Sequence, residues 1–200
     1  MRFASTLKSL AAVLSLLAVL PANAGMIDFD GTAAPAVFAS TTPLSDRYIS
    51  LGLTFAGATG VGGEILNQAA EMGFMAHSGT DFLAFNTEAG LGQDERIEFA
   101  GALSSVSVYL ASLPSGTFTL TAFDGIGNLL GATSLASSRD WQAMTLSYEG
   151  IRSVVVASTT SSWALDDLSF AASAEVPEPG GIVLLGAALL GFVGSRRKRA

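Results

Sequence analysis

The sequence predicts an all-β fold, an antiparallel β-sandwich or jelly roll, with an N-terminal signal helix and a C-terminal transmembrane helix. Two features of the middle part predict the sandwich. Apolar residues alternate with polar ones in short segments, and clusters of Gly, Asn, Asp and Ser recur about every 8–12 residues. Residues 26–170 show no sustained 3.6-residue apolar period, which argues against a helical domain.

The alternation is clearest in residues 103–110, where Val106 and Val108 alternate with serines. Such a period of two residues is typical of a half-buried strand. Between the predicted strands, Asp124-Gly125 predicts a hairpin turn rather than a phosphate loop, because the glycine spacing is wrong and no helix follows. The glycine-rich residues 57–80 are expected to form a long loop with one short helical turn. The other predicted strands cover residues 117–123, 141–148 and 151–156.

Charge separates the ends of the chain from its middle. Residues 25–176 hold four basic and sixteen acidic residues. A surface of this sign repels nucleic acid, which requires clustered Lys and Arg. The chain has no cysteine, so disulfides and thiolate metal sites are excluded, and its single histidine, His77, excludes a multi-histidine site.

Residues 1–24 have the three parts of a secretory signal peptide. A basic start with Arg2 and Lys8 precedes an apolar run over residues 10–20, and Ala22-Asn23-Ala24 follows. Small residues at Ala22 and Ala24 are what signal peptidase requires. We therefore predict passage through the export machinery, cleavage by signal peptidase and a mature protein that begins at Gly25.

Residues 175–200 form a tail of three parts in fixed order. A Pro-Glu-Pro motif is followed by a small and apolar stretch over residues 180–195 and by a terminal basic cluster. The stretch is roughly 24 Å long as a helix, slightly short of a bilayer core, and its glycines favour transient membrane engagement over permanent anchorage. Basic clusters stay cytoplasmic, which places the middle domain outside the inner membrane. The residues of this predicted motif are Val176, Pro177, Glu178, Pro179, Arg196, Arg197, Lys198 and Arg199.

This tail resembles the PEP-CTERM sorting tail, which is also called the ice-binding protein C-terminal domain. The resemblance implies a Gram-negative bacterium and recognition by an exosortase that acts near Pro177-Glu178-Pro179. It further implies an association with exopolysaccharide or biofilm production. The ice-binding label describes where the tail was noticed, and ice binding is not expected of this chain.

The middle domain, residues 25–174, more loosely resembles the jelly rolls of exported PEP-CTERM proteins and of carbohydrate-binding modules. The order of its pieces along the chain carries this resemblance. They are Ile27-Asp-Phe-Asp30, the segment from Tyr48 to Phe55, the Phe123-Asp-Gly hairpin and Ala164-Leu-Asp-Asp-Leu-Ser-Phe170.

Four aspartates are candidates for a structural Ca²⁺ site: Asp28, Asp30, Asp166 and Asp167. The first and last strands of a jelly roll often lie side by side, which would bring the two pairs together. Asp166 shares a face with Leu168 in a regular strand, so we expect it to point inward, where a carboxylate needs a partner or a metal. The alternative is that backbone N–H groups at a strand end satisfy Asp166.

For three other features, we compare a functional role with an ordinary structural one. His77 lacks a nucleophile elbow nearby and is expected to be an ordinary loop histidine. The cluster Asp94-Glu95-x-x-Glu98 is expected to be a solvated strand edge rather than a pair of catalytic carboxylates. Trp141 and Trp163 are expected in the core rather than as platforms for sugar rings.

These observations favour a non-enzymatic surface or matrix protein that binds extracellular polysaccharide or another envelope component. The alternative is a secreted glycan-active hydrolase that uses acidic residues. A third reading is a purely structural matrix protein. A concave sheet face with an exposed tryptophan would favour sugar binding, whereas a pocket with two carboxylates roughly 5–10 Å apart would favour hydrolysis.

Overall fold

The computed structural model describes residues 24–31, 34–38, 42–70 and 72–173. These residues form nine strands and three short 3₁₀ helices, in agreement with the predicted all-β class. In chain order the elements are β1 (Ala24–Ile27), η1 (Ile49–Leu51), β2 (Leu53–Ala56), β3 (Glu64–Asn67), η2 (Gln68–Ala70), β4 (Asp81–Asn86), η3 (Thr87–Ala89), β5 (Asp94–Ser112), β6 (Thr117–Phe123), β7 (Leu129–Ala136), β8 (Gln142–Ser158) and β9 (Ser162–Ala172).

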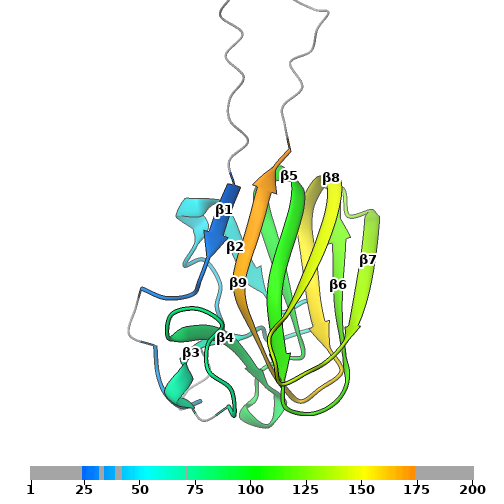
Figure 1. The fold of residues 1–200 in the computed structure, drawn as a ribbon. Helices are drawn as coiled ribbons and strands as arrows, with labels where there is room; N and C mark the ends of the chain where they lie inside the picture. Colours follow the sequence, from blue (N-terminus) through cyan, green and yellow to red (C-terminus); the bar gives the residue numbers. More distant parts are fainter. Residues whose placement is uncertain (1–23, 32–33, 39–41, 71, 174–200) are drawn as a thin grey trace, which may run out of the picture. The chain divides into compact units, whose positions relative to one another are not determined.

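All strand pairs are antiparallel, and the strand order is β3-β4-β9-β5-β8-β6-β7, with β1 beside β9 and β2 beside β5 (Figure 1). The long strands β5 and β8 belong to two layers. The first part of β5 pairs with β2, and its last part, after a register irregularity between Glu98 and Leu103, pairs with β9. We call the layer with β9 the front layer and the layer with β2, β6 and β7 the back layer.

The core lies between these layers. Trp163 on β9 stacks on Phe85 of β4 with ring centroids 3.8 Å apart, and it contacts Phe118 on β6 at 5.9 Å. Since β9 and β6 are separated by two strands in the sheet order, this contact shows that the layers pack face to face. Within β6, Phe118, Leu120 and Ala122 are buried and the threonines point outward, as alternation predicts.

Strand β4 is buried on both faces. In β4, Phe82 and Ala84 join a second hydrophobic cluster, whereas Leu83 and Phe85 face the main core. The second cluster is covered by residues 72–80, the segment that precedes β4. The sequence predicted residues 57–80 as one long irregular loop with one short helical turn, and η2 is such a turn. The structure corrects the expectation of a single loop, because β3 forms within the segment and pairs with β4.

The predicted hairpin at Asp124-Gly125 is confirmed, with Gly127 in the left-handed region at φ 85°. The predicted signal helix and the predicted transmembrane helix lie outside the described residues. Within the described ranges, no helix is long and apolar enough to cross a membrane.

Candidate functional site

Residues 72–80 lie against the outer face of the front layer and carry much of the candidate site. Side chains from before β8 hold the first half of this segment. Trp141 Nε1 donates to the Met75 carbonyl at 2.8 Å, and Arg139 Nε donates to the Gly73 carbonyl at 2.7 Å. Because N–H hydrogen bonds are directional, each of these bonds orients both the donating side chain and the accepting loop carbonyl.

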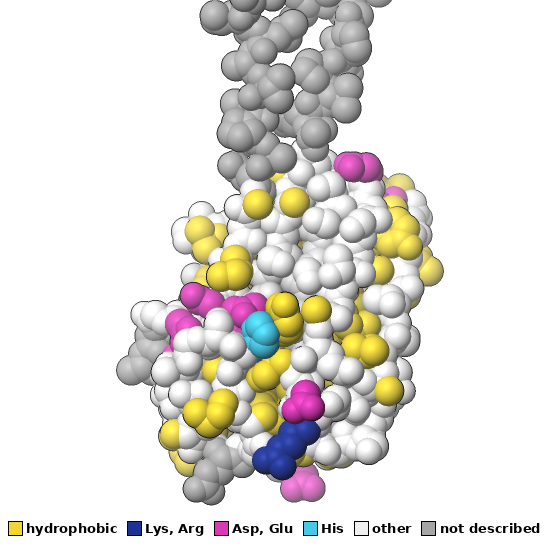
Figure 2. All heavy atoms as spheres, in the orientation of Figure 1, with side chains coloured by type: hydrophobic (Ala, Val, Ile, Leu, Met, Phe, Trp, Pro, Cys, Tyr) yellow, Lys and Arg dark blue, Asp and Glu magenta, His cyan; other side chains and the backbone are white. Residues whose placement is uncertain are grey.

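An aromatic cluster forms where this segment meets the sheet; it consists of Phe74, His77, Tyr109 and Trp141. The His77 and Tyr109 rings are stacked, with centroids 3.7 Å apart and planes at 19°. Trp141 packs edge-on against His77 at 5.9 Å and against Phe74 at 5.5 Å. Figure 2 shows the histidine with acidic side chains on one side and hydrophobic side chains on the other. The cluster combines aromatic surface with adjacent charge.

A pocket of about 310 Å³ lies beside the indole of Trp141. Trp141 itself is half-buried, so part of its ring remains accessible to a ligand. Arg139 and Asp140 add a cationic and an anionic group next to the aromatic surface. We call this feature the Trp141 pocket; its lining residues are Phe74, Met75, Ala76, Arg139, Asp140 and Trp141.

Two aspartates of β9 anchor the second half of the segment. Asp166 Oδ2 accepts the backbone N–H of His77 at 2.8 Å and that of Ser78 at 3.2 Å. Asp167 accepts His77 Nδ1 at 2.5 Å and Ser78 Oγ at 2.6 Å. His77 and Ser78 therefore both bind the same carboxylate. This differs from a catalytic triad, in which the serine would hydrogen-bond to the histidine.

Burial raises the pKa of Asp166 to about 7, and the neighbouring Asp167 charge adds to this effect. The hydrogen bonds from Ser78, Asp167 and His77 oppose it by stabilising the carboxylate. Asp166 is fully buried beneath the loop. A group of this kind holds structure and does not reach a ligand in solution.

The predicted orientation of Asp166 is wrong, although its burial is confirmed. Asp167 adopts φ 46°, and the register of β9 against β5 shifts between Ser107 and Tyr109. This irregularity interrupts the alternation, so Asp166 lies opposite Tyr109 and bonds the covering loop, while Leu168 faces the core. Backbone N–H groups do satisfy Asp166, as the alternative predicted, but Asp166 lies in the middle of β9 rather than at a strand end, and two of the three donors belong to the covering loop.

The other pair of predicted calcium ligands lies after β1. β1 pairs with β9, as expected for the first and last strands, with Ile27 opposite Leu168. Asp28 is exposed, and Asp30 accepts the backbone N–H of Thr80 at 2.9 Å and that of Asp81 at 3.0 Å. Backbone donors thus form hydrogen bonds with the Asp30 and Asp166 carboxylates, where a cation was expected to bind them.

The structure does not assemble the predicted Ca²⁺ site. In the described part of the chain, no three His, Cys, Asp or Glu side chains are grouped so that they could hold a metal ion. The physical reason is that Asp30, Asp166 and Asp167 each turn toward the segment 77–81 and bind its N–H, hydroxyl or imidazole groups.

The expected solvated edge at Asp94, Glu95 and Glu98 is also corrected, because only Glu98 is exposed. Asp94 Oδ1 accepts the backbone N–H groups of Ala58 and Thr59 at 2.6 and 3.0 Å. Glu95 Oε2 accepts the N–H of Gly63 at 2.8 Å, and burial raises the Glu95 pKa to about 8. These carboxylates hold residues 57–63 in place and do not form an open acidic site.

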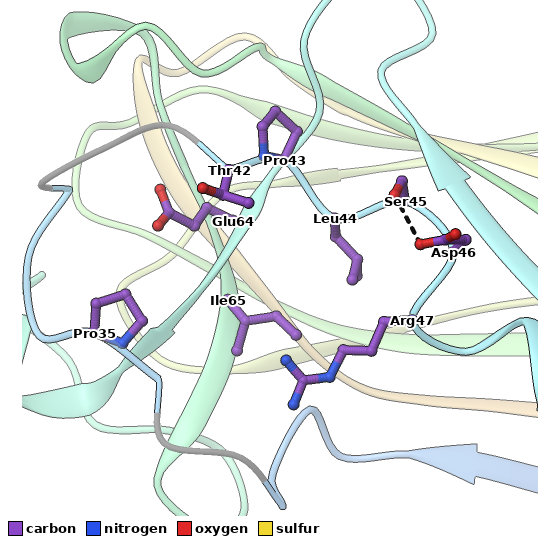
Figure 3. A pocket seen from close by; sticks show the side chains of 9 residues that line it. All are labelled: Pro35, Thr42, Pro43, Leu44, Ser45, Asp46, Arg47, Glu64 and Ile65. Atoms are coloured by element: carbon purple, nitrogen blue, oxygen red, sulfur yellow. Dashed lines mark hydrogen bonds between the residues drawn. The ribbon is translucent and has the colours of Figure 1, made fainter.

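A second pocket, of about 380 Å³, lies between residues 42–47 and β3 (Figure 3). Figure 3 shows the Glu64 carboxylate next to Thr42 and the Arg47 guanidinium on the other side of Ile65. Burial raises the pKa of Glu64. This pocket has no aromatic face for a sugar ring among its described lining residues, which distinguishes it from the Trp141 pocket.

Both tryptophans were expected in the core, but only one of them is fully buried there. Trp163 is fully buried in the core, as predicted, whereas Trp141 lies at the surface pocket. His77 is a loop histidine, as predicted, but its stack on Tyr109 was not foreseen. The stack on Tyr109 joins residues 32 positions apart, and no local pattern indicates that two such residues will meet.

Comparisons with known proteins identify the tail. Residues 175–198 match the PEP-CTERM protein-sorting motif. No curated protein matches the chain. Similar solved structures include a cleaved adhesin domain of Lys-gingipain from Porphyromonas gingivalis, at 13% identity over 76% of this chain and 99% of that chain, with a TM-score of 0.47. A DUF4465 family protein from Bacteroides caccae has 13% identity over 80% and 97%, with a TM-score of 0.48.

A family 6 carbohydrate-binding module is also similar, at 11% identity over 61% of this chain and 95% of that chain, with a TM-score of 0.34. These scores are all below 0.5, and the function of this chain is not inferred from them. The sorting motif is informative by itself, because it implies export, recognition by an exosortase and a membrane-anchored C-terminal tail before processing. The predicted tail is thereby confirmed: residues 175–198 are a PEP-CTERM protein-sorting motif.

Proposed function

We propose that this chain is a cell-envelope or extracellular-matrix protein whose sandwich domain binds an extracellular polysaccharide without cleaving it. The proposal includes removal of the signal peptide after Ala24, sorting by an exosortase and a role in exopolysaccharide or biofilm. The observation that supports the binding function is the Trp141 pocket, because a half-buried indole, an arginine and an aspartate line it together.

Each part of this pocket suits a sugar ring. The apolar C–H face of a pyranose stacks on an indole, and its hydroxyls need donors and acceptors at the rim. Arg139 uses Nε to bond the Gly73 carbonyl, which fixes the guanidinium and leaves its other N–H groups for hydroxyls. Asp140 supplies an acceptor beside it. The pocket volume of about 310 Å³ is at the lower end of the usual range for small-ligand sites.

The alternative of a glycan hydrolase finds less support at this site. Asp166 has the raised pKa of an acid catalyst, but the loop covers it completely. Asp167 is engaged by His77 and Ser78. Hydrolysis needs two carboxylates that both reach the scissile bond. A binding module requires only the surface that Trp141, Arg139 and Asp140 provide.

Binding should be measured by a glycan array on the exported protein, followed by titration calorimetry with the best ligand. Trp141→Ala should weaken binding by at least about tenfold, since truncating an aromatic hot spot costs about 2 kcal/mol or more. Arg139→Ala should also weaken it. Equal affinity of the Trp141→Ala variant and the unmodified protein would exclude this pocket as the binding site.

Arg152→Ala is the matched control for Arg139→Ala. Arg152 is also exposed, and its Nε also donates to one backbone carbonyl, that of Phe99 at 3.1 Å. Both variants therefore lose the same kind of hydrogen bond, but only Arg139 lines the Trp141 pocket. Release of reducing ends from the bound glycan would favour the hydrolase instead.

A further inference from the structure

The described domain receives both terminal segments at one end. β1 runs antiparallel to β9 with Ala24 opposite Ala171, so the first and last described residues, Ala24 and Ser173, lie at the same end of the domain. The backbone N–H of Ser173 donates to the Ala102 carbonyl at 2.9 Å, and the N–H of Gly150 donates to Ser173 Oγ at 3.4 Å. This is the end at which β5 and β8 pass from one layer to the other (Figure 1). We call it the tail-side end.

Exposed apolar side chains gather at the tail-side end. Among the described residues, ten large hydrophobic side chains are exposed, and five of them border this end. Ile126, at the tip of the β6–β7 hairpin, is 86% exposed and Leu129 is 63% exposed. The five residues, which we call the apolar rim, are Ile49, Leu51, Ile126, Leu129 and Tyr148.

Hydrogen bonds connect the parts of the rim to the crossing of β5. Gly52, which follows η1, accepts the Ala100 N–H at its carbonyl at 2.8 Å, so Ile49 and Leu51 lie beside this crossing. On the other side, Gly125 lies against the Arg152 side chain, and Arg152 bonds the Phe99 carbonyl.

Tyr148 completes the rim, since its ring covers Gly131 two residues beyond Leu129. Exposed apolar groups that gather at one end of a domain usually mark a contact surface.

We propose that the apolar rim rests on the lipid surface of the membrane that holds the C-terminal tail, in the precursor before exosortase processing. The proposal relies on the tail anchor that the sorting motif implies. Six residues separate Ser173 from Gly180, where the apolar stretch begins. A linker of this length spans at most about 20 Å, so the tail-side end cannot move far from the bilayer.

The charges at this end indicate which force holds the contact. Three acidic side chains lie here, since Glu98 and Glu149 are exposed and Asp124 is half-buried. Two arginines accompany them, the exposed Arg152 and the half-buried Arg96, so the acidic charge is in excess. Anionic lipid headgroups would therefore be repelled rather than attracted. Contact must come from apolar side chains entering the headgroup region, helped by the high local concentration that the tether creates. Binding to a zwitterionic surface should be at least as strong as binding to an anionic one.

The test uses the full-length precursor in phosphatidylcholine liposomes. Since the chain has no cysteine, Ile126→Cys accepts a single environment-sensitive fluorophore without other changes. Leu113→Cys is the control, because Leu113 is 47% exposed and follows the end of β5 away from the tail-side end. The fluorophore at position 126 should be quenched by doxyl-labelled lipid. It should also be shielded from aqueous iodide about threefold relative to position 113, as expected for a group at headgroup depth.

Equal iodide quenching at both positions, with no doxyl quenching at 126, overturns the proposal. Shielding at 126 without doxyl quenching means that protein covers the rim, which also overturns the lipid contact. Flotation of the precursor with the liposomes is measured in the same samples. If the precursor does not float, the tail anchor itself fails, and this result is distinguishable from a floating precursor whose rim stays in water.

Discussion

Glu95 is the most strongly perturbed carboxyl group described in this domain. It lies on β5 with no exposed surface, and Oε2 accepts the Gly63 N–H, while Oε1 has no partner within hydrogen-bonding distance among the described residues. Burial without full compensation raises its pKa from 4.5 to about 8. Glu95 therefore keeps its proton at neutral pH in the folded domain.

The raised pKa gives the stability a defined pH dependence. Between about pH 4.5 and pH 8 the unfolded state loses the Glu95 proton that the folded state retains, so the free energy of unfolding falls as pH rises. Glu95→Gln is neutral throughout, so the gain in the free energy of unfolding from this substitution should be larger at pH 8.5 than at pH 5, by about 4 kcal/mol. Urea unfolding at the two pH values measures this difference.

The exposed Glu98→Gln is the control and should leave the pH dependence nearly unchanged. The free energy of unfolding of the Glu95→Gln variant should still fall somewhat as pH rises, because the raised pKa of Asp166 acts in the same direction. If Glu95→Gln destabilises the domain equally at both pH values, then Glu95 is ionised in the folded state.

At the scale of single residues, alternation in the sequence predicts well only where strands are regular. Val106, Val108, Phe118 and Leu120 are buried as their patterns indicate. Alternation does not predict the direction of the Asp166 side chain, because this direction depends on one backbone angle at Asp167. It also does not predict the burial of Glu95, because Glu95 is covered by residues 57–63, which are more than thirty positions away. Neither cause leaves a local signal.

At the scale of elements, the covering segment is held by carboxylates from both terminal strands. Asp30, just after β1, bonds the N–H groups of Thr80 and Asp81, while Asp166 of β9 bonds those of His77 and Ser78. Gly79 lies between these anchors with φ 56°. The loop that supports the Trp141 pocket thus depends on the pairing of β1 with β9.

Gly79→Ala should release the Asp30 anchor. Its Cβ would collide with the Asp30 carboxylate, and an L residue is strained at this φ. Gly127→Ala is the matched control, because Gly127 has φ 85° with open space around its Cα. The control should cost only the backbone strain, about 1–2 kcal/mol.

Gly79→Ala should cost at least about 2 kcal/mol more than this control, since hydrogen bonds to a charged group are also lost. Equal losses in thermal or urea unfolding would mean that Asp30 does not anchor the loop. Hydrogen exchange at Thr80 and Asp81 gives a second readout, because both amides should exchange faster in Gly79→Ala alone.

The elements that the sequence missed are those without their own periodicity. Alternation predicted β6 and parts of β5 and β8, although β8 was expected as two strands, over 141–148 and 151–156, and is one continuous strand. The β6–β7 hairpin was predicted from Asp124-Gly125. β3 is short and its residues are almost all buried, so it shows no alternation. The path of residues 72–80 is fixed by distant partners, Trp141 and the β9 aspartates, and could not be read from the segment itself.

At the scale of the whole domain, the crossing of β5 and β8 separates two surfaces. The terminal segments join at the tail-side end, whereas the Trp141 pocket lies toward the opposite end of the front layer. Ala172 lies six positions after Asp166 along β9, which corresponds to about 20 Å along a strand. A domain tethered by its tail would therefore present the pocket away from the membrane, toward extracellular polymers.

This arrangement requires that the domain and the end of the chain lie on opposite sides of the inner membrane. Arg196, Arg197, Lys198 and Arg199 are the orientation signal, because clustered basic residues resist translocation. A reporter fused after Ala200 should be active only as a cytoplasmic fusion. Replacing the four residues by Ser or Gln should allow the end of the tail to cross the inner membrane and should reduce retention of the precursor.

The control replaces the four basic residues of the middle domain, Arg47, Arg96, Arg139 and Arg152, by Gln, which makes the same change in net charge outside the tail. This variant should keep the orientation of the unmodified precursor, because the rule applies to residues close to the membrane span. Protease added to intact spheroplasts should cleave the domain in the unmodified precursor but leave a C-terminal epitope protected. A periplasmic reporter, or an epitope that protease removes, would contradict the topology on which both the sorting and the outward-facing pocket depend.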